Sequence, residues 1–321
     1  MFSRFLIRSR SDMQNYRFLA IVVLLYFCAS LPVAIRSQGG SWEGELADWR
    51  EQQAKALQEP DGWLSLVGLA WLEPGFNTFG SAPDNQIHLP AGGPRYAGVL
   101  QLDGKTIRLM PPPGGFPQGF QVDGKPAESQ TLNVSDKGDE NNPRLTFGTL
   151  NMYVISRGDR LALRIKDSKS AAITGFRGLR WFPPNERYRV NARWIPYDPP
   201  KLATLSTLVG TRYTRPVPGV AEFVIAGKTH RLEPILEDPK IEKLHFILRD
   251  RTSRSTTYGA CRFLYTGFPD RGLAQPGQLV LDFNRLENPP CAYTTYATCP
   301  LPPPGNRLPI ALPAGEKRYH D

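Results

Sequence analysis

The sequence predicts a mainly β protein with an N-terminal helix, a β-sandwich, and a second antiparallel β-domain ending in a Pro-rich loop. Three observations support this fold class. The 321 residues contain 29 Gly and 31 Pro, more than helix bundles carry. From Asn77 onward, turn signals recur at intervals of about ten residues. Apolar residues make up 40% of the chain, which is enough for a packed core.

Residues 1–38 read as a targeting segment. Arginines precede an apolar run at 18–31, which Pro32 ends. The run is shorter than the ~20 residues of a membrane-spanning helix, so a secretory signal peptide is expected. The protein would then be exported, to the periplasm or outside the cell. An uncleaved signal anchor in the inner membrane is the alternative.

The net charge of +9 does not indicate a nucleic-acid-binding protein. Residues 1–37 contain five of the 39 basic and one of the 30 acidic residues, so the remainder carries +5. These charges are mixed along the chain, with no basic run interleaved with aromatics. We therefore expect no nucleic acid, and membrane contact only through an uncleaved N-terminal segment. The sequence does not indicate an oligomeric state.

Residues 41–75 form an expected helical lead-in. Within Ser41 to Gln58, Trp42, Leu46 and Trp49 recur at roughly helical spacing with charges between them. The more apolar stretch at 61–75 follows and ends at a Pro-Gly turn. Its tryptophans are flanked by aliphatic residues and are expected in the core.

Residues 76–182 read as the β-sandwich, because short apolar stretches alternate with turn dipeptides such as Asp103-Gly104 and Asp123-Gly124. Strands are expected at 97–102, 105–110, 120–122, 145–147, 152–156 and 161–166.

Residues 183–321 form the expected second β-domain. Pro clusters at 181–185 and 196–201 mark the break between the two domains. Strands are expected at 188–195, 220–226, 228–232, 243–249, 256–265 and 278–284.

The stretch 281–317 carries isolated polar residues in a backbone stiffened by eight prolines. Proline restricts φ and removes a donor, so the stretch is rigid but cannot be an interior strand. Rigid irregular backbone of this kind can present a binding site. The alternative is structural, because such side chains often satisfy buried backbone groups.

Strand alternation selects the candidate site residues. It places Asp282 and Asn284 on one face of their strand, and Tyr258 and Arg262 on one face of another. If the strands are neighbours, Arg262 pairs with Asp282. The full set of candidate binding residues is Tyr258, Arg262, Asp282, Asn284, Asn288, Asn306, Arg307 and Lys317.

Cys291 and Cys299 lie eight residues apart, and a disulfide between them is expected in an oxidising compartment. Packed thiols or metal ligands are the alternatives, although this spacing is not that of a zinc site. We expect no metal. Cys261 is expected to be a core thiol away from the pair.

Signatures of common enzymes are missing. The chain has no G-x-S-x-G, HExxH, P-loop, G-x-G-x-x-G or C-x-x-C sequence, so no cofactor is expected. The four histidines are His88, His230, His245 and His320. Each is expected to be at the surface or satisfied by neighbours, so neither a zinc hydrolase nor a Ser-His-Asp enzyme is predicted.

Two stretches resemble a bacterial and archaeal family, domain of unknown function 1684. They are LRDRTSRSTTYGACRFLY at 248–265 and the C-terminal DFNRLENPPCAYTTYATCPLPPPGNRLP followed by AGEK. The resemblance covers nearly the whole mature chain and implies no established activity. Family members usually carry Gly where Cys261 stands, which argues against a functional role for this thiol.

A further, weaker resemblance links the sandwich to forkhead-associated domains. It rests on WLEPGFNTFGSAPDNQIHLP at 71–90, VDGKP at 122–126 and LTFGTLNMYVI at 145–155. In that family an Arg after the Gly and a Ser-x-x-His hold phosphothreonine. Ser81 follows Gly80 here, and 94–97 has neither Ser nor His. The resemblance therefore implies a degenerate sandwich without the phosphopeptide clamp.

Three functions remain open. The first is an exported protein that binds a small polar ligand in the C-terminal β-domain. The second is an envelope hydrolase that uses Asp282 or Glu316 as general acid or base. The third is a protein-interaction module that acts through the degenerate sandwich.

Overall fold

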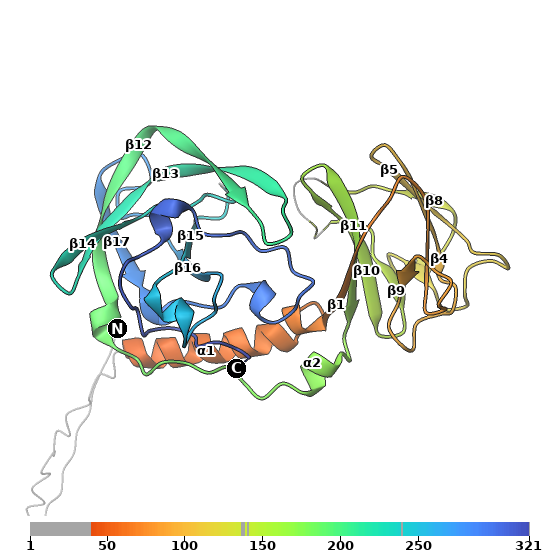
Figure 1. Cartoon of the computed structure of the whole chain (residues 1–321), viewed down its shortest axis with the longest axis horizontal. Helices are drawn as coiled ribbons and strands as arrows, with labels where there is room; N and C mark the ends of the chain where they lie inside the picture. Colours follow the sequence, from red (N-terminus) through yellow and green to blue (C-terminus); the bar gives the residue numbers. More distant parts are fainter. Residues whose placement is uncertain (1–39, 136–138, 140, 239, 321) are drawn as a thin grey trace, which may run out of the picture. The chain divides into compact units, whose positions relative to one another are not determined.

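The computed structural model describes residues 40–135, 139, 141–238 and 240–320. It confirms the mainly β prediction, with an N-terminal helix followed by several antiparallel sheets (Figure 1). The predicted targeting segment at 1–38 lies outside the described residues. Within the described ones, no helix has both the length and the apolar character needed to span a membrane.

Helix α1, Trp42–Gln58, matches the predicted helix to within one residue. Its N-cap is Ser41, whose hydroxyl accepts from the N–H of Gly44, and Pro60 follows its end. The expected helical lead-in is wrong beyond this point. After a short 3-10 turn, η1 (Trp63–Ser65), the chain forms strand β1, Leu66–Trp71, because this stretch pairs antiparallel with β11.

Two sheets make up the sandwich. One has the order β1-β11-β10-β9-β6-β7 and the other the order β3-β2-β4-β5-β8. Their shared core includes Phe79 and Leu100 from one sheet and Met152 and Leu163 from the other. The strands are β2 Gly75–Gly80, β3 Ile87–His88, β4 Gly98–Asp103, β5 Thr106–Met110, β6 Gln121–Val122, β7 Lys125–Pro126, β8 Gln130–Leu132, β9 Leu145–Phe147, β10 Leu150–Arg157 and β11 Arg160–Asp167. The likeness to a forkhead-associated domain stays a prediction.

The C-terminal part holds a four-stranded sheet of order β14-β13-β12-β17 and the pair β15-β16. Their common core includes Trp194, Phe223, Phe246 and Phe283. The strands are β12 Arg189–Ser206, β13 Arg212–Ile225, β14 Lys228–Leu232, β15 Leu244–Leu248, β16 Arg262–Thr266 and β17 Gly277–Asp282. The short helices are α2 Ala171–Thr174, η2 Glu186–Tyr188, η3 Arg251–Arg254, η4 Phe283–Arg285, η5 Pro290–Ala292 and η6 Pro304–Asn306.

Two predicted boundaries differ from the structure. The Pro cluster at 196–201 lies inside β12 rather than in a linker, and the register with β13 shifts between Pro196 and Lys201. Prolines cannot donate to the ladder, so the strand passes them with an irregularity. The strand expected at 256–265 begins only at Arg262, because the N–H groups of Thr256 and Thr257 turn back to Thr252.

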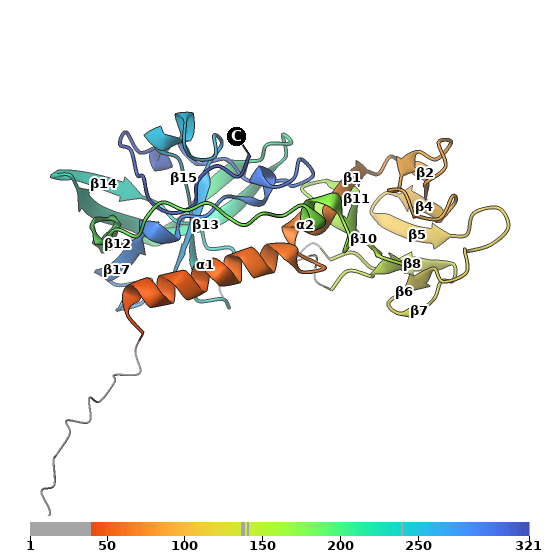
Figure 2. The same ribbon diagram turned by 90° about the horizontal axis from the view of Figure 1, so that it is seen from below.

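Helix α1 packs against the C-terminal part, although it precedes the sandwich in sequence (Figure 2). The indole N–H of Trp42 donates to Asp282 at 2.7 Å, and the Trp49 and Trp181 rings meet edge to face at 5.4 Å. Residues 41–321 form one compact unit. The division into domains at 182/183 stays a prediction.

Candidate functional site

Arg262, a predicted binding residue, is the centre of a closed ion pair. It pairs with Asp250, and it donates to the carbonyls of Leu312 at 3.0 Å and Ala314 at 2.5 Å. Both charged side chains are fully buried, and burial lowers the pKa of Arg262.

The predicted pair of Arg262 with Asp282 is therefore wrong. The two strands are not neighbours, because β16 pairs with β15 while β17 pairs with β12. The expected face-sharing is also wrong, because Tyr258 lies before β16 and Asn284 lies in η4 after β17.

Asp282 instead caps η4 and fastens helix α1. One carboxylate oxygen accepts from the backbone and side-chain amides of Asn284, and the other accepts from Trp42. The side chain of Asn284 also bonds to the backbone N–H and C=O of Asn185. Both candidates are enclosed by partners that hold loops and helix together.

Asn306 has the same kind of role. Its side chain accepts from the N–H of Glu233 at 2.9 Å and donates to the carbonyls of Glu233 and Ile247. It thereby satisfies backbone groups that have no ladder partner. Arg307, the next residue, is exposed. Tyr258 donates from its hydroxyl to the Cys291 carbonyl at 3.0 Å.

Glu316, the second predicted acid or base, is 1% exposed. It accepts from the Tyr293 hydroxyl and the N–H of Asn288, each at 2.8 Å. Burial raises the pKa of Glu316 to about 7. Lys317 follows it, and its ammonium group lies over the Phe182 ring at 5.0 Å. Neither Glu316 nor Asp282 lines the cleft described below.

The three cysteines of the described chain are free and share one core cluster. The N–H of Cys291 donates to the sulfur of Cys299 at 3.1 Å, so the two residues are adjacent. The disulfide between them stays a prediction. Cys261 is fully buried, as expected, but it packs in the same cluster as Cys299 rather than away from the pair.

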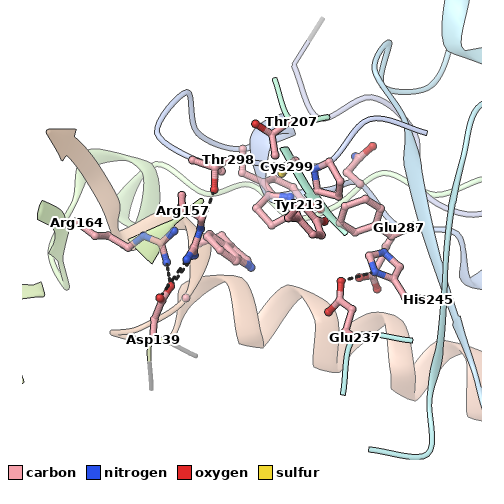
Figure 3. A pocket seen from close by; sticks show the side chains of 18 of the residues that line it. Asp139, Arg157, Arg164, Thr207, Tyr213, Glu237, His245, Glu287, Thr298 and Cys299 are labelled. Carbon is pink, nitrogen blue, oxygen red and sulfur yellow. Dashed lines mark hydrogen bonds and ion pairs between the residues drawn. The ribbon is translucent and has the colours of Figure 1, made fainter. Parts of the chain in front are cut away.

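The described residues enclose a cleft of about 1020 Å³. Its walls include parts of helix α1, the β10–β11 hairpin, the start of β13, strands β15 and β16, and the C-terminal stretch at 287–300. Figure 3 shows part of this lining. Of the predicted binding residues, only Asn288 lines the cleft. Its amide nitrogen donates to the Lys317 carbonyl, while its buried oxygen has no partner among the described residues.

A histidine–carboxylate pair forms one end of the cleft (Figure 3). His245, on β15, bonds through Nδ1 to Glu237 at 2.8 Å. A carboxylate only accepts, so Nδ1 donates to Glu237 and Nε2 is the ring nitrogen left for another partner, an acceptor in the neutral imidazole. The ring stacks on Tyr265 and meets Phe263 edge to face, each with centroids 4.4 Å apart. Nε2 is buried and has no partner among the described residues.

The pKa values of two carboxyl groups at this end of the cleft are shifted in opposite directions. The hydrogen bond from His245 lowers the pKa of Glu237, which therefore stays ionised at neutral pH. Glu287 is partly buried, and loss of hydration, followed by the negative charge of Glu316, raises the pKa of Glu287 to about 8. At pH 7 the site therefore offers one charged acceptor and one largely protonated carboxylic acid.

Glu287 is positioned by backbone rather than by its side chain. Its N–H and C=O bond to the C=O and N–H of Phe263 at 3.0 Å each, which places it beside β16. No group of three or more His, Cys, Asp or Glu suited to a metal ion occurs among the described residues.

Sequence reasoning missed Glu237, His245 and Glu287. His245 sits in an apolar strand and was expected to be a satisfied or surface histidine. Its partner comes from the loop eight residues earlier, and no short-range pattern links them. Glu287 was within the signature next to Asn288, so its position was the available signal.

Residues 174–317 match the family described as "Protein of unknown function (DUF1684)". The predicted resemblance is thus confirmed for the C-terminal part, which contains Glu237, His245 and Glu287. Among solved structures, an uncharacterized protein of Haloarcula marismortui, determined by solution NMR, is 28% identical. That match covers 46% of this chain and 80% of the archaeal chain, with a TM-score of 0.40. No curated protein matches.

Proposed function

We propose that the protein binds a small polar ligand in this cleft, with Glu237, His245 and Glu287 as its principal polar contacts. The observation that carries the proposal is the buried Nε2 of His245, which has no partner among the described residues. Leaving such an atom unsatisfied costs about 1–3 kcal/mol, whereas a ligand donor removes that cost.

The surroundings fit a ligand site better than a packing defect. The oxygen of Asn288 is a second buried acceptor without a partner in the described chain, and it lines the same cleft. Tyr213, Tyr265 and Tyr293 supply aromatic surface around these polar atoms. Apolar walls with a few convergent polar groups are typical of small-molecule sites.

The polar groups also restrict the ligand chemistry. His245 and Asn288 accept hydrogen bonds, Glu237 accepts with a negative charge, and protonated Glu287 donates. A ligand with several hydroxyl, amide or amine donors and at least one acceptor complements this set.

A melting-temperature screen of the full chain against sugars, amino acids, amines and carboxylic acids tests the proposal. Hits should stabilise the native protein, and His245→Gln should weaken their binding about tenfold or more. His230→Gln is the matched control, because His230 is also buried with an unpartnered Nε2 but lies on β14 outside the cleft. Hits that bind His245→Gln as tightly as the parent would contradict the proposal.

Hydrolysis at the same cleft is a second candidate, favoured by the split between the two carboxyl pKa values. His245, oriented by Glu237, would take a proton from water, while protonated Glu287 would protonate a leaving group. This assignment replaces Asp282 and Glu316, which are enclosed. Chromogenic esters and glycosides provide the assay. Turnover that survives both His245→Gln and Glu287→Gln would rule the mechanism out.

We further propose that the protein works outside the cytosol. The support is the Arg-rich, apolar segment at 1–38 and the adjacency of Cys291 and Cys299, which suits a disulfide. Fractionation with N-terminal sequencing, and thiol counting on exported protein, test both points. One free thiol per mature chain is expected. Intact cytosolic protein would contradict export, and three free thiols would contradict the disulfide.

A further inference from the structure

The second polar end of the cleft lies on the β10–β11 hairpin of the sandwich. Arg157, Arg164 and Asp139 line the cleft there, away from the His245 pair (Figure 3). Arg157 ends β10, and Arg164 lies in the middle of β11. These residues play no part in the function proposed above.

One carboxylate serves two guanidinium groups at this end. Arg157 donates to both oxygens of Asp139, at 2.6 and 3.1 Å, and Arg164 donates to one of them at 3.2 Å. Arg157 also donates to the Thr298 hydroxyl at 3.2 Å. Among the described residues at this end, the single carboxylate of Asp139 pairs with both guanidinium groups, so it offsets only one of their two positive charges.

The incompletely paired positive charge is energetically costly because Arg164, one of the side chains that carry it, is buried. The Arg164 side chain is only 5% exposed, and its buried Nε has no partner among the described residues. Lys166, two residues further on the same face of β11, is also buried; it bonds to the Asp61 carbonyl and has the Asp61 carboxylate at 3.6 Å. A buried guanidinium with incomplete pairing is costly, and a bound anion would offset that cost.

Arginine also has the right geometry for this task. A guanidinium presents a planar set of N–H donors that matches the oxygens of a carboxylate or phosphate. The buried Nε of Arg164 is a donor without a partner among the described residues, while Arg157 is 30% exposed and therefore accessible from the cleft. The Trp63 ring, also in the cleft wall, has its centroid 5.6 Å from the Arg164 guanidinium, within the range of a cation–π contact.

We infer that Arg157 and Arg164 form an anion subsite, so that the ligand of this cleft carries a carboxylate or phosphate group. The inference rests on the proposed function and gives its ligand a second end. The anion lies against the arginines, and the hydrogen-bonding groups face His245, Asn288 and Glu287.

The test measures binding of inorganic phosphate and, separately, acetate to the full chain by NMR or calorimetry at constant ionic strength. Both probes report the shared anion chemistry, and their ratio identifies the preferred group. Arg164→Met, which keeps the aliphatic stem, should weaken the preferred anion about tenfold or more. The matched control is Arg108→Met, because Arg108 is exposed on β5 outside the cleft, and it should change binding less than about twofold.

Two further variants keep the result decisive. Arg157→Gln, at the more exposed position, replaces Arg164→Met if the latter does not fold, and the same weakening is expected. His230→Gln should leave anion binding unchanged, because His230 lies on β14 outside the cleft.

Failure of both anions to bind, or binding to the arginine variants as tight as to the parent protein, would overturn the subsite. That result would leave the His245 function standing if polar ligands still bind. If anions bind as expected but no polar ligand binding depends on His245, the anion subsite stands and the function proposed for His245 is wrong.

Discussion

The Pro-rich C-terminal stretch and the His245 end of the cleft both bury polar side chains, but they satisfy them differently. Asn306 uses its amide for three hydrogen bonds to backbone, and Asp282 accepts from two neighbours. His245 leaves Nε2 unpaired, and Asn288 leaves its oxygen unpaired, within the described chain. The comparison shows that rigidity and polar residue types do not by themselves distinguish a site from a scaffold. Hydrogen-bonding atoms without a described partner, on residues that line a cavity, do.

The largest expected effect on stability concerns the buried ion pair of Asp250 and Arg262. Asp250→Asn leaves the Arg262 guanidinium buried without its counterion, so the free energy of unfolding should fall by about 3–5 kcal/mol. Urea denaturation measures it, with Asp238→Asn at an exposed position as the control. Adding Arg262→Met to Asp250→Asn should recover part of the loss. A loss below about 1 kcal/mol would show that this pair is not structural.

A smaller loss is expected from Asn306→Ala, about 2–3 kcal/mol, because it strands backbone groups of Glu233 and Ile247. Asn191→Ala, at an exposed position on β12, is the control and should change stability by less than about 0.5 kcal/mol. Equal effects of the two substitutions would remove the distinction between scaffold and surface.

The stability of the protein should depend on pH through two carboxyl groups, Glu287 in the cleft and Glu316 outside it. The raised pKa values of Glu287, about 8, and Glu316, about 7, mean that the native state holds protons that the unfolded state releases near pH 4.3. Stability should therefore decrease as pH rises from about 4.5 to about 8, and then level off. Glu287→Gln should remove a part of this decrease, on the order of 1–3 kcal/mol.

Melting temperatures at pH 5 and pH 8 measure that effect. Glu128→Gln is the control, because Glu128 is exposed in the loop before β8. A parent protein that becomes more stable across this pH range, or an unchanged slope in Glu287→Gln, would contradict the assignment of a protonated Glu287.

The smallest effect on stability should come from a substitution at the His245 end of the cleft. His245→Gln removes one hydrogen bond to the half-exposed carboxylate of Glu237. The free energy of unfolding should therefore change by about 1 kcal/mol or less, while ligand binding is lost. Urea denaturation beside the binding screen separates the two readouts. A loss comparable to that of Asp250→Asn would place His245 in the scaffold instead.

Local patterns predicted the elements well where pairing is local. The helix at 42–58 follows from its capping serine and apolar spacing, and the hairpin strand at 228–232 follows from its flanking turn. The strand at 66–71 was not predicted, because its partner β11 lies about a hundred residues away along the chain. Long-range pairing decides such segments.

The candidate site was harder to predict for the same reason. Alternation expected Asp282 with Asn284, and Tyr258 with Arg262, on common strand faces, but Asn284 lies in η4 and Tyr258 precedes β16. Alternation also could not say which strands are neighbours. Asn288 was predicted and does reach the cleft, whereas His245 looked ordinary in its apolar strand. Its role depends on a loop carboxylate and on a cavity assembled from distant segments, neither of which one-dimensional spacing records.

Ligand binding beside His245 can be located by amide and side-chain NMR shift mapping of the full chain, titrated with a library of small polar molecules. We expect ligand-induced shifts concentrated at Glu237, His245, Tyr265, Glu287 and Asn288, with Asp282 and Asn306 unaffected. Shifts concentrated at Asp282, Asn284 and Asn306 would contradict this expectation, because the closed network would then be the site.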